Sequence, residues 1–263
     1  MKLLTLNCHS WQEDDQLSKI KILAESIKDH DYDVIALQEV SQHIEEPFYD
    51  KHIRKNNYAL VLLEELQNLG IHDYQLSWDV SHIGYDVYEE GSAIITKHPI
   101  VRQGSFFVSK NENISYWKTR KVVFAEVEIE NQLMMFYSCH LGWWKDDEEP
   151  FRYQADSLLR MTDTGQRAFL MGDFNNNAFI RGEGYDYLIQ KGLTDTYTAA
   201  EDKDAGITVK GEIAGWDRNK SNLRLDLILT NMPAAVSYSK VIFNGINREV
   251  VSDHYGVETN IIL

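Results

Sequence analysis

The chain has 263 residues, of which 43% are hydrophobic and 25% charged, with four prolines and two cysteines. This composition is typical of a globular protein and excludes a disordered chain, a collagen-like repeat and a disulfide scaffold. Acidic residues outnumber basic residues by 41 to 26, which gives a net charge of −15 at pH 7. A surface of this sign repels polyphosphates, so binding of duplex DNA or of an anionic membrane would require a local basic patch.

Hydrophobic periodicity predicts alternating strands and helices in the first 70 residues. The expected elements are a strand over residues 2–7, a helix over 17–27, a strand over 34–37 and a helix over 57–69. Asp14 or Asp15 is placed to cap the first helix, and Gly70 suits the left-handed position that ends the second. The run over 34–37 is continuously apolar, as in strands that are covered on both faces.

After Gly70 the pattern changes to strands and then repeats the mixed order. Strands are expected over 74–80, 92–96, 121–129, 133–138, 168–171, 225–229 and 256–262, and helices over 149–161 and 185–191. Asn131 and Gln132 are the predicted turn of a hairpin. Two similar halves favour two packed sheets with helices on the outer faces, and residues 194–223 are the best candidate for a long functional loop.

The chain is expected to be one catalytic domain over residues 1–263, because no linker rich in Pro, Gly or Ser divides it. The apolar stretch at the amino terminus is too short for a signal peptide, and no run approaches the roughly 18 to 20 apolar residues that span a bilayer. Two cysteines suit a reducing compartment. We therefore expect a cytoplasmic protein without membrane insertion, and the sequence does not indicate its oligomeric state.

Polar side chains stand at the ends of the apolar strands, and they are the informative feature. They are Asn7, Glu39, His140, Asp173, Asn175, Asp226, Asp253 and His254. Asp226 lies inside an apolar strand, where a carboxylate is costly unless it is paired, so we expect a histidine as its partner. Oxygen donors dominate the set. They favour a hard cation such as Mg²⁺, with Mn²⁺ as an alternative, over zinc.

Seven segments resemble, in order and spacing, the motifs of the endonuclease/exonuclease/phosphatase superfamily. They are Leu4-Thr5-Leu6-Asn7, Leu37-Gln38-Glu39-Val40, residues 91–100, Ser138-Cys139-His140-Leu141, Gly172-Asp173-Phe174-Asn175, Leu225-Asp226-Leu227-Ile228 and Ser252-Asp253-His254. The resemblance covers nearly the whole chain. It implies a DNase I-like fold, which is a four-layered α-β-β-α sandwich of two packed mixed sheets flanked by helices.

The same resemblance implies the metal site and the partner of one catalytic histidine. Glu39 is similar to the principal Mg²⁺ ligand of the family, with Asn7 beside it. Asp253 stands where the family has an acidic partner to the metal or to a histidine. Asp226 and His254 are similar to a couple in which the carboxylate fixes the imidazole tautomer and the imidazole acts as base.

Three further residues would complete the chemistry by resemblance. His140 is similar to the histidine that binds a phosphoryl oxygen or protonates the leaving group. Asp173 and Asn175 are similar to the pair that orients the attacking water and holds the phosphorus centre. Either Asp173 or His254 could remove the proton from that water. Together these groups would meet the needs of phosphate ester hydrolysis, which are an in-line water, charge neutralisation and a stabilised leaving group.

Candidate substrate-binding residues flank this set. Trp143 and Trp144 follow His140 closely and could form a platform for a sugar ring or a nucleobase, or one of them could pack in the core. Arg120 could bind a substrate phosphate with two hydrogen bonds or neutralise neighbouring glutamates.

We expect a Mg²⁺-dependent phosphomonoesterase acting on a small phosphorylated sugar. The net charge and the acidic residues beside the tryptophans support this expectation and argue against nucleic acid. Residues 140–146 also resemble the phosphatase branch that acts on maltose 6'-phosphate. The alternatives are a phosphodiesterase, either a nuclease or a sphingomyelinase-like lipid hydrolase, and a binding module without activity. A nuclease should have Lys and Arg clusters along the substrate path, and only residues 118–121 resemble one.

Overall fold

The computed structural model describes all 263 residues and contains two large β-sheets, two short ribbons and five helices. The first sheet contains β1 (Lys2–Asn7), β2 (Val34–His43), β5 (Gln75–Gly84), β6 (Tyr88–Thr96), β12 (Ala200–Lys203), β16 (Ala235–Ile242) and β17 (Gly256–Ile262). The second contains β7 (Ile100–Phe107), β8 (Lys121–Ile129), β9 (Gln132–His140), β10 (Ala168–Asp173), β11 (Thr194–Asp195) and β15 (Asp226–Thr230). The ribbons pair β3 (Phe48–Asp50) with β4 (Ile53–Arg54) and β13 (Val209–Lys210) with β14 (Asn222–Leu223). The helices are α1 (Gln16–His30), α2 (Tyr58–Asn68), α3 (Phe151–Thr162), α4 (Gly184–Gln190) and α5 (Thr196–Ala199).

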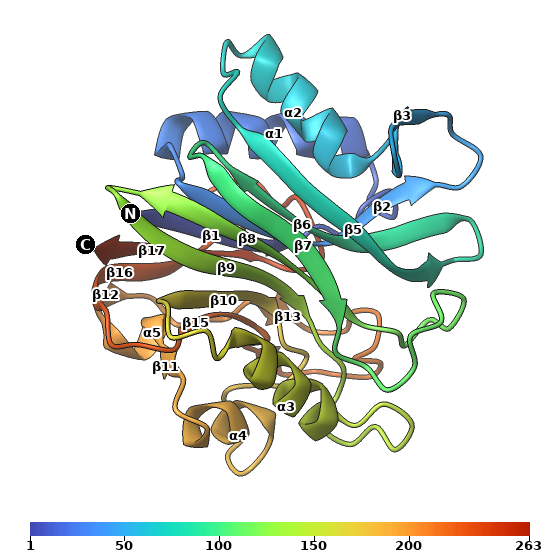
Figure 1. Cartoon of the computed structure of the whole chain (residues 1–263). Coiled ribbons are helices and arrows are strands. Elements are labelled where there is room, and N and C mark those ends of the chain that lie inside the picture. Colours follow the sequence, from blue (N-terminus) through green and yellow to red (C-terminus); the bar gives the residue numbers. More distant parts are fainter.

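The two sheets pack face to face, and helices cover both outer faces (Figure 1). The strand order is β12-β16-β17-β1-β2-β6-β5 in the first sheet and β11-β15-β10-β9-β8-β7 in the second. Both sheets contain parallel and antiparallel pairs. Helices α1 and α2 lie on the first sheet, and α3 and α4 lie on the second. The predicted four-layered α-β-β-α sandwich is therefore confirmed.

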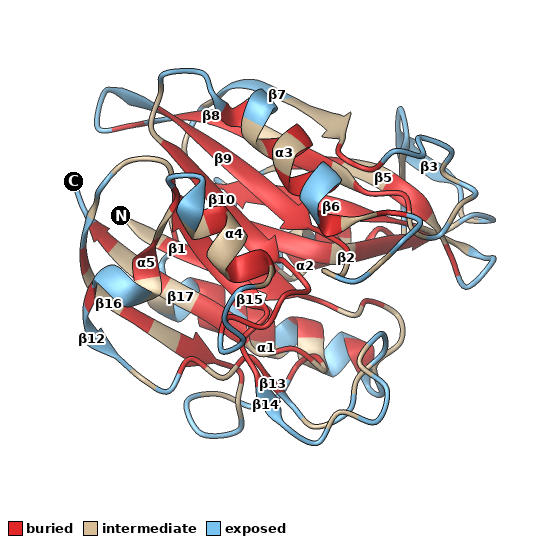
Figure 2. Ribbon diagram, turned by 90° about the horizontal axis from the view of Figure 1, so that it is seen from below, coloured by how far each residue is buried: buried red, intermediate tan, exposed pale blue.

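Three hydrophobic layers hold these four structural layers together, and strand alternation assigns the side chains to them. On β9, Met134 and Phe136 belong to the cluster between the sheets, whereas Met135 and Tyr137 belong to the cluster under α3 and α4. Successive residues of a strand point to opposite faces, so an unbroken apolar strand supplies both layers. Figure 2 shows the result, with buried residues concentrated in the strands and on the inner sides of the helices.

Some local expectations were wrong. The sequence analysis missed β7 and β16, whose exposed and polar residues hide the strand pattern. Asp15 precedes α1 but makes no side-chain capping bond. The hairpin turn is Glu130-Asn131, where both residues have positive φ, and β9 begins at Gln132. By contrast, the side chain of Asn57 caps α2, and Gly70 has the expected left-handed conformation at φ 84°.

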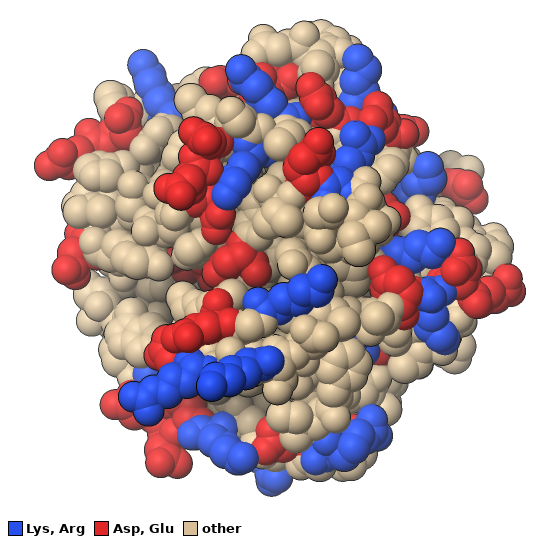
Figure 3. Space-filling model, turned by 180° about the vertical axis from the view of Figure 1, so that it is seen from behind, with Lys and Arg blue, Asp and Glu red and all other residues tan.

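Charges are mixed on the surface, as the composition suggested. On the face shown in Figure 3, Lys and Arg side chains are interspersed with Asp and Glu side chains and form no continuous basic band. None of the helices is both long enough and apolar enough to cross a membrane.

Candidate active site

Three neighbouring strands of the second sheet place three polar residues in one row. His140 on β9 lies opposite Asp173 on β10, and Asp173 lies opposite Asp226 on β15. The backbones of β9 and β10 approach so closely here that a Cβ atom on Gly172 would lie 1.9 Å from the carbonyl oxygen of Cys139. Only glycine fits at this position, so the sequence Gly172-Asp173 fixes the carboxylate at the strand end.

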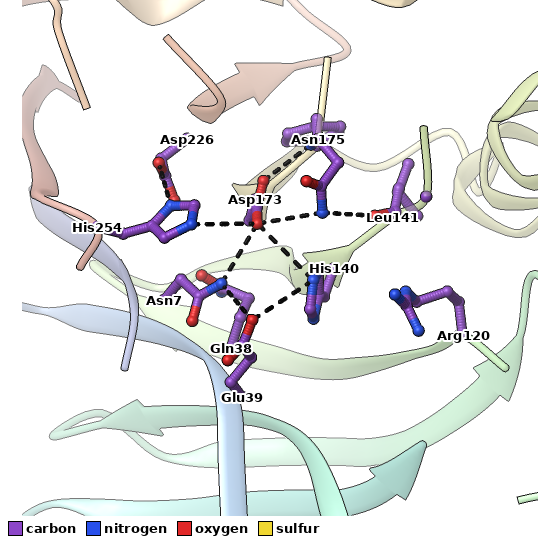
Figure 4. Close-up of polar contacts among 12 residues, drawn as sticks. Asn7, Gln38, Glu39, Arg120, His140, Leu141, Asp173, Asn175, Asp226 and His254 are labelled. Atoms are coloured by element: carbon purple, nitrogen blue, oxygen red, sulfur yellow. Dashed lines mark hydrogen bonds and ion pairs between the residues drawn. The ribbon is translucent and has the colours of Figure 1, made fainter. Parts of the chain in front are cut away.

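The first sheet contributes Asn7 and Glu39 from the adjacent parallel strands β1 and β2. The register of β2 shifts between Leu37 and Val40, and Glu39 in this bulge has a left-handed backbone with φ 52°. Such bulges redirect side chains, and non-glycine residues in this conformation are common at functional sites. Asn7 Nδ2 donates to Glu39 Oε1 at 2.9 Å and to Asp173 Oδ2 at 3.3 Å, which links the two sheets (Figure 4).

Asp226 and His254 form a buried pair, as predicted. His254 Nδ1 is 2.9 Å from Asp226 Oδ2, and the other ring nitrogen, Nε2, is 3.9 Å from Asp173 Oδ2. Burial disfavours the imidazolium, but the charges of Asp226 and Asp173 outweigh it and raise the pKa of His254. Ser252 Oγ donates to the carbonyl oxygen of Asn7 at 2.7 Å and so ties the loop that carries His254 to β1.

Asp173 lies at the centre of the site, and its contacts radiate from it in Figure 4. Its carboxylate accepts hydrogen bonds from the backbone N–H of Asn175 at 2.8 Å and from Asn175 Nδ2 at 3.2 Å. His140 Nε2 is 3.7 Å from Asp173 Oδ2. Burial, together with the negative charges of Asp226 and Glu39, raises the pKa of Asp173 to about 7. A carboxyl group that titrates near neutral pH can accept or donate a proton at working pH.

The residues at this site fit a divalent cation. Three groups of acidic and histidine side chains could each hold a metal ion, namely Glu39 with Glu90 and His140, Asp173 with Asp226 and His254, and His9 with Glu13 and Asp253. Burial and the charge of Asp253 raise the pKa of Glu39. Neither Lys nor Arg forms an ion pair with Glu39, whose one ion-pair partner is His140 at 3.9 Å. A buried carboxylate such as Glu39, which has neither Lys nor Arg as a partner, suits a bound cation.

The three predicted metal ligands differ in how they lie. Glu39 lines the pocket of the site. Asn7 turns its Nδ2 toward the carboxylates because its Oδ1 accepts from the backbone N–H of His9 at 3.2 Å. Asp253 faces His9, with Oδ1 3.7 Å from His9 Nδ1, and does not line the pocket. Glu39 is therefore the best placed of the three for a cation that also contacts a substrate.

The pocket beside Glu39 has a volume of about 390 Å³. It is lined by residues from both sheets and from six loops, among them His140, Asp173, Asn175, His254, Arg120, Trp117, Trp143, Tyr85, Gly215 and Asp217. The sequence analysis named most of the chemistry-bearing residues in this set, and its expected functional loop of residues 194–223 contains Gly215 and Asp217, although these two residues were not named.

Glu90 and His82 were also missed. They lie opposite each other on β6 and β5, with His82 Nε2 3.3 Å from Glu90 Oε1. Burial and the charge of Glu39 raise the pKa of Glu90 to about 8, and burial together with the charge of Arg120 lowers that of His82 to about 3. The signal available in the sequence was a charged residue directly before the Gly91-Ser92 motif.

Arg120 is buried and lines the pocket. Its Nη1 donates to the carbonyl oxygens of Trp117 and Thr119, but no carboxylate lies within ion-pair distance and its Nε has no partner. Burial lowers the pKa of Arg120. A buried guanidinium without a carboxylate partner suits an anionic ligand better than the neutralisation of a glutamate.

The two neighbouring tryptophans have different surroundings. Trp143 lines the pocket and packs beside Trp117, with ring centroids 6.1 Å apart. Trp144 packs on Phe151 and Tyr187, with centroids 6.0 and 5.9 Å away, and lies outside the pocket. Trp144 is therefore a half-buried residue at the edge of the core under α3 and α4, and Trp143 is the tryptophan that borders the catalytic groups.

Two comparisons with known proteins identify the family of the chain. A model of the Endonuclease/Exonuclease/phosphatase family matches residues 4–254. A family protein from Leptotrichia buccalis has 42% sequence identity, full coverage of both chains and a TM-score of 0.94. The chain belongs to the endonuclease/exonuclease/phosphatase family. Members of this family hydrolyse phosphate esters, so we assign the chain to the hydrolases of such esters.

More distant members of the family share the fold. A mannosyl-6-phosphatase from Bacteroides thetaiotaomicron is 18% identical over the full length of both chains, with a TM-score of 0.72. Truncated TDP2 from Caenorhabditis elegans is 16% identical, with a TM-score of 0.66 over 100% of this chain and 97% of its own. No curated protein sequence matches the chain.

Proposed function

We propose that the protein is a divalent-metal-dependent phosphomonoesterase that acts on a small phosphorylated sugar. The observation that carries this proposal is the bounded pocket of about 390 Å³ that joins the imidazole and carboxylate groups to Arg120 and to the indole rings of Trp117 and Trp143. A phosphoryl group beside Arg120 and a sugar ring against the indoles would fill a site of this size and chemistry.

Gly215 forms part of the pocket wall beside Trp143. An added Cβ on Gly215 would be 2.5 Å from the Trp143 ring, so the loop of residues 211–219 lies against the tryptophan. A nucleic acid would need Lys and Arg side chains along the path of its backbone, whereas Arg120 is the one such residue in the pocket lining. The mannosyl-6-phosphatase with this fold adds support, because its name describes an enzyme of a phosphorylated sugar.

Residues of both sheets would share the catalytic work, with residues 1–263 acting as one domain. Glu39, with Asn7 and Asp253 nearby, would hold Mg²⁺ or Mn²⁺, and the bound ion would neutralise charge on the phosphoryl oxygens. Asp173 and His254, 3.9 Å apart, form the pair that takes the proton of the attacking water. Because the two groups are close enough for their titrations to be coupled, we assign the proton taken from the water to the pair and not to one residue.

The remaining groups orient the reactants. Asp226 holds the imidazole of His254 so that Nε2 faces Asp173. Asn175 donates to Asp173 and keeps that carboxylate directed toward the pocket. His140 lies on the other side of Asp173, where it can donate to a phosphoryl oxygen or to the leaving oxygen. The cytoplasm is the location that we propose, since phosphorylated sugars are charged and stay within the compartment that makes them.

A turnover panel tests the proposal. Purified protein with Mg²⁺, with Mn²⁺ or with EDTA is given hexose 6-phosphates, disaccharide phosphates, nucleotides and bis-esters, and released phosphate or alcohol is measured. We expect the sugar phosphates to have the highest kcat/KM, the chelator to remove the activity, and His254→Gln to be inactive while remaining folded. Turnover confined to diesters, or turnover unaffected by EDTA, would contradict the proposal.

A further inference from the structure

Trp216 reaches the active site from the loop of residues 211–219. Its indole Nε1 donates to Asn175 Oδ1 at 3.0 Å. The ring packs against a small hydrophobic cluster of Val209, Leu223 and Leu225 at the base of the loop. Its backbone N–H donates to Ile213 O at 3.0 Å. These contacts fix the position of the indole ring independently of its hydrogen bond to Asn175.

The loop is fixed by two further contacts. Asn219 Nδ2 donates to the carbonyl oxygens of Gly211 and Ser221, which closes the loop on itself. Gly215, with φ +79°, lies against Trp143 in the pocket wall. Trp216 follows Gly215 directly in the sequence. One short segment therefore carries both the residue in the pocket wall and the residue that contacts Asn175.

The hydrogen bond from Trp216 is one of three that fix the orientation of the Asn175 amide, and it is the one that holds the amide oxygen. An indole N–H can only donate, so the atom that it meets must be the amide oxygen. The amide nitrogen then faces two acceptors, Asp173 Oδ2 at 3.2 Å and Leu141 O at 3.0 Å (Figure 4). Rotating the amide by half a turn would oppose donor to donor at the indole and acceptor to acceptor at the other two contacts. All three hydrogen bonds would be lost together.

We propose that Trp216 is a positioning residue for the hydrolysis, acting through Asn175. By fixing the amide oxygen, it keeps Asn175 Nδ2 on the carboxylate of Asp173 and so keeps that carboxylate aligned for the attacking water. The inference rests on the proposed role of Asn175 and Asp173 in phosphate ester hydrolysis. It adds a residue from the loop, outside the strand-end motifs, to the groups on which the rate depends.

The hydrogen bond itself can be tested without a substrate. In ¹H–¹⁵N spectra of the metal-free protein, we expect the Trp216 indole proton, assigned by through-bond experiments, to resonate downfield and to exchange slowly with solvent. In Asn175→Ala it should move upfield and exchange at least about tenfold faster, because its acceptor is gone. The indole signal of Trp78, whose Nε1 donates to Val40 O at 2.9 Å outside the pocket, serves as an internal control. An unchanged Trp216 signal would overturn the proposal.

A double-mutant cycle tests the effect on the reaction. Trp216→Phe keeps an aromatic ring in the hydrophobic cluster but removes the N–H together with part of the indole. We expect kcat to fall about tenfold with KM within about twofold, as for loss of one hydrogen bond that aligns the reacting groups. In the Asn175→Ala background the same change should have no further effect. Lys220→Ala is the matched control. Lys220 is exposed and follows the loop directly in the sequence, so its substitution should leave kcat and KM unaltered.

The outcomes separate this inference from the proposed function. Equal losses from Trp216→Phe in both backgrounds, or a change confined to KM, would contradict a positioning role through Asn175. The cycle is run on whichever phosphate ester the turnover panel finds to be hydrolysed. Failure of every sugar phosphate would refute the proposed substrate, whereas the indole signal and the cycle on another ester would still decide the role of Trp216. If Trp216→Phe does not fold, the Asn175→Ala spectra, with Trp216 intact, decide it.

Discussion

His140 and Asp173 lie directly opposite each other on the parallel strands β9 and β10, and His140 Nε2 is 3.7 Å from Asp173 Oδ2. The distance between an imidazole and a carboxylate is thus set by strand pairing, and Asp226 on β15 continues the same row. Groups carried by paired strands are held more precisely than groups carried by loops. This arrangement makes the effects of several substitutions predictable.

Asp226→Asn should disable the reaction while leaving the protein folded. The amide would no longer hold His254 in the tautomer that presents Nε2 to Asp173, and the imidazolium would lose its charged partner. We expect kcat to fall by a factor of about 10² to 10⁴, as in other hydrolases whose histidine loses its carboxylate. Steady-state kinetics and thermal unfolding of the same preparation check this prediction.

Asp195→Asn is the matched control, because Asp195 is a second buried aspartate close to β15. It pairs with Arg224 at 2.8 Å and accepts from Tyr185 at 2.8 Å, outside the pocket. Removing one partner of a buried ion pair costs about 3 to 5 kcal/mol. Asp195→Asn should therefore lower Tm and leave kcat close to that of the wild type. The same loss of kcat in both variants would refute the assigned role of Asp226.

Trp143→Ala should affect substrate binding, whereas Trp144→Ala should affect the stability of the fold. Trp143 lines the pocket, so its removal should raise KM for a sugar phosphate about tenfold, in the range of stacking contributions. Trp144 packs on Phe151 and Tyr187, so its removal should lower the free energy of unfolding by about 3 kcal/mol and leave KM unchanged. Kinetics and denaturant unfolding on both variants check the pair. A higher KM only in Trp144→Ala would reverse our assignment.

Metal-free protein should lose stability as pH rises above about 6.5. Burial raises the pKa of Asp173 to about 7 and that of Glu90 to about 8, so the folded state binds protons that the unfolded state has released. The free energy of unfolding then falls with pH until these groups ionise. The raised pKa of His254 adds to this fall above the usual histidine range near 6.5. The lowered pKa values of His82 and His140 have the opposite effect, but only below that range.

Chemical denaturation in EDTA at about pH 6.5, 7.5 and 8.5 measures this dependence. We expect Glu90→Gln to reduce the fall in the free energy of unfolding between pH 6.5 and 8.5 by on the order of 2 kcal/mol, because glutamine does not titrate. Mg²⁺ should reduce the slope in the wild type, because a bound cation favours the ionised carboxylates. A free energy of unfolding that rises with pH between 6.5 and 8.5 would contradict the prediction.

Glu39→Gln should weaken cation binding and yet stabilise the metal-free protein. It removes the carboxylate that lines the pocket, and with it the repulsion from Asp253 that raises the pKa of Glu39. We expect kcat to fall at least about a hundredfold and Mg²⁺ binding by calorimetry to become undetectable, with a higher Tm in EDTA. Glu45→Gln, on the exposed turn after β2, is the control and should match the wild type in all three measurements.

Most of the candidate site could be predicted because its side chains stand where apolar strands end. Asn7, His140 and Asp173 each close a short apolar run, and the sheet then brings these ends to one edge. The pairing of Asp226 with a histidine also followed from the cost of an unpaired buried carboxylate.

Other features of the site are contacts between residues far apart in the sequence, which hydrophobic periodicity does not predict. Glu90 and His82 meet because β5 and β6 pair in one register, which depends on the whole sheet. Trp144 turns away from the pocket because α3 and α4 offer it Phe151 and Tyr187. Trp216 reaches Asn175, 41 residues away in the chain, from within the expected functional loop of residues 194–223, but no local pattern in that loop predicted which residue it would contact.

The order of strands in the first sheet also bears on how the chain comes off the ribosome. Asn7 closes the first strand to be synthesised, and His254 precedes β17, which enters the sheet between β1 and β16. Every other group of the catalytic centre is therefore synthesised before His254. The centre is complete only when β17 has paired between β1 and β16, so enzymatic turnover can serve as a readout of that pairing.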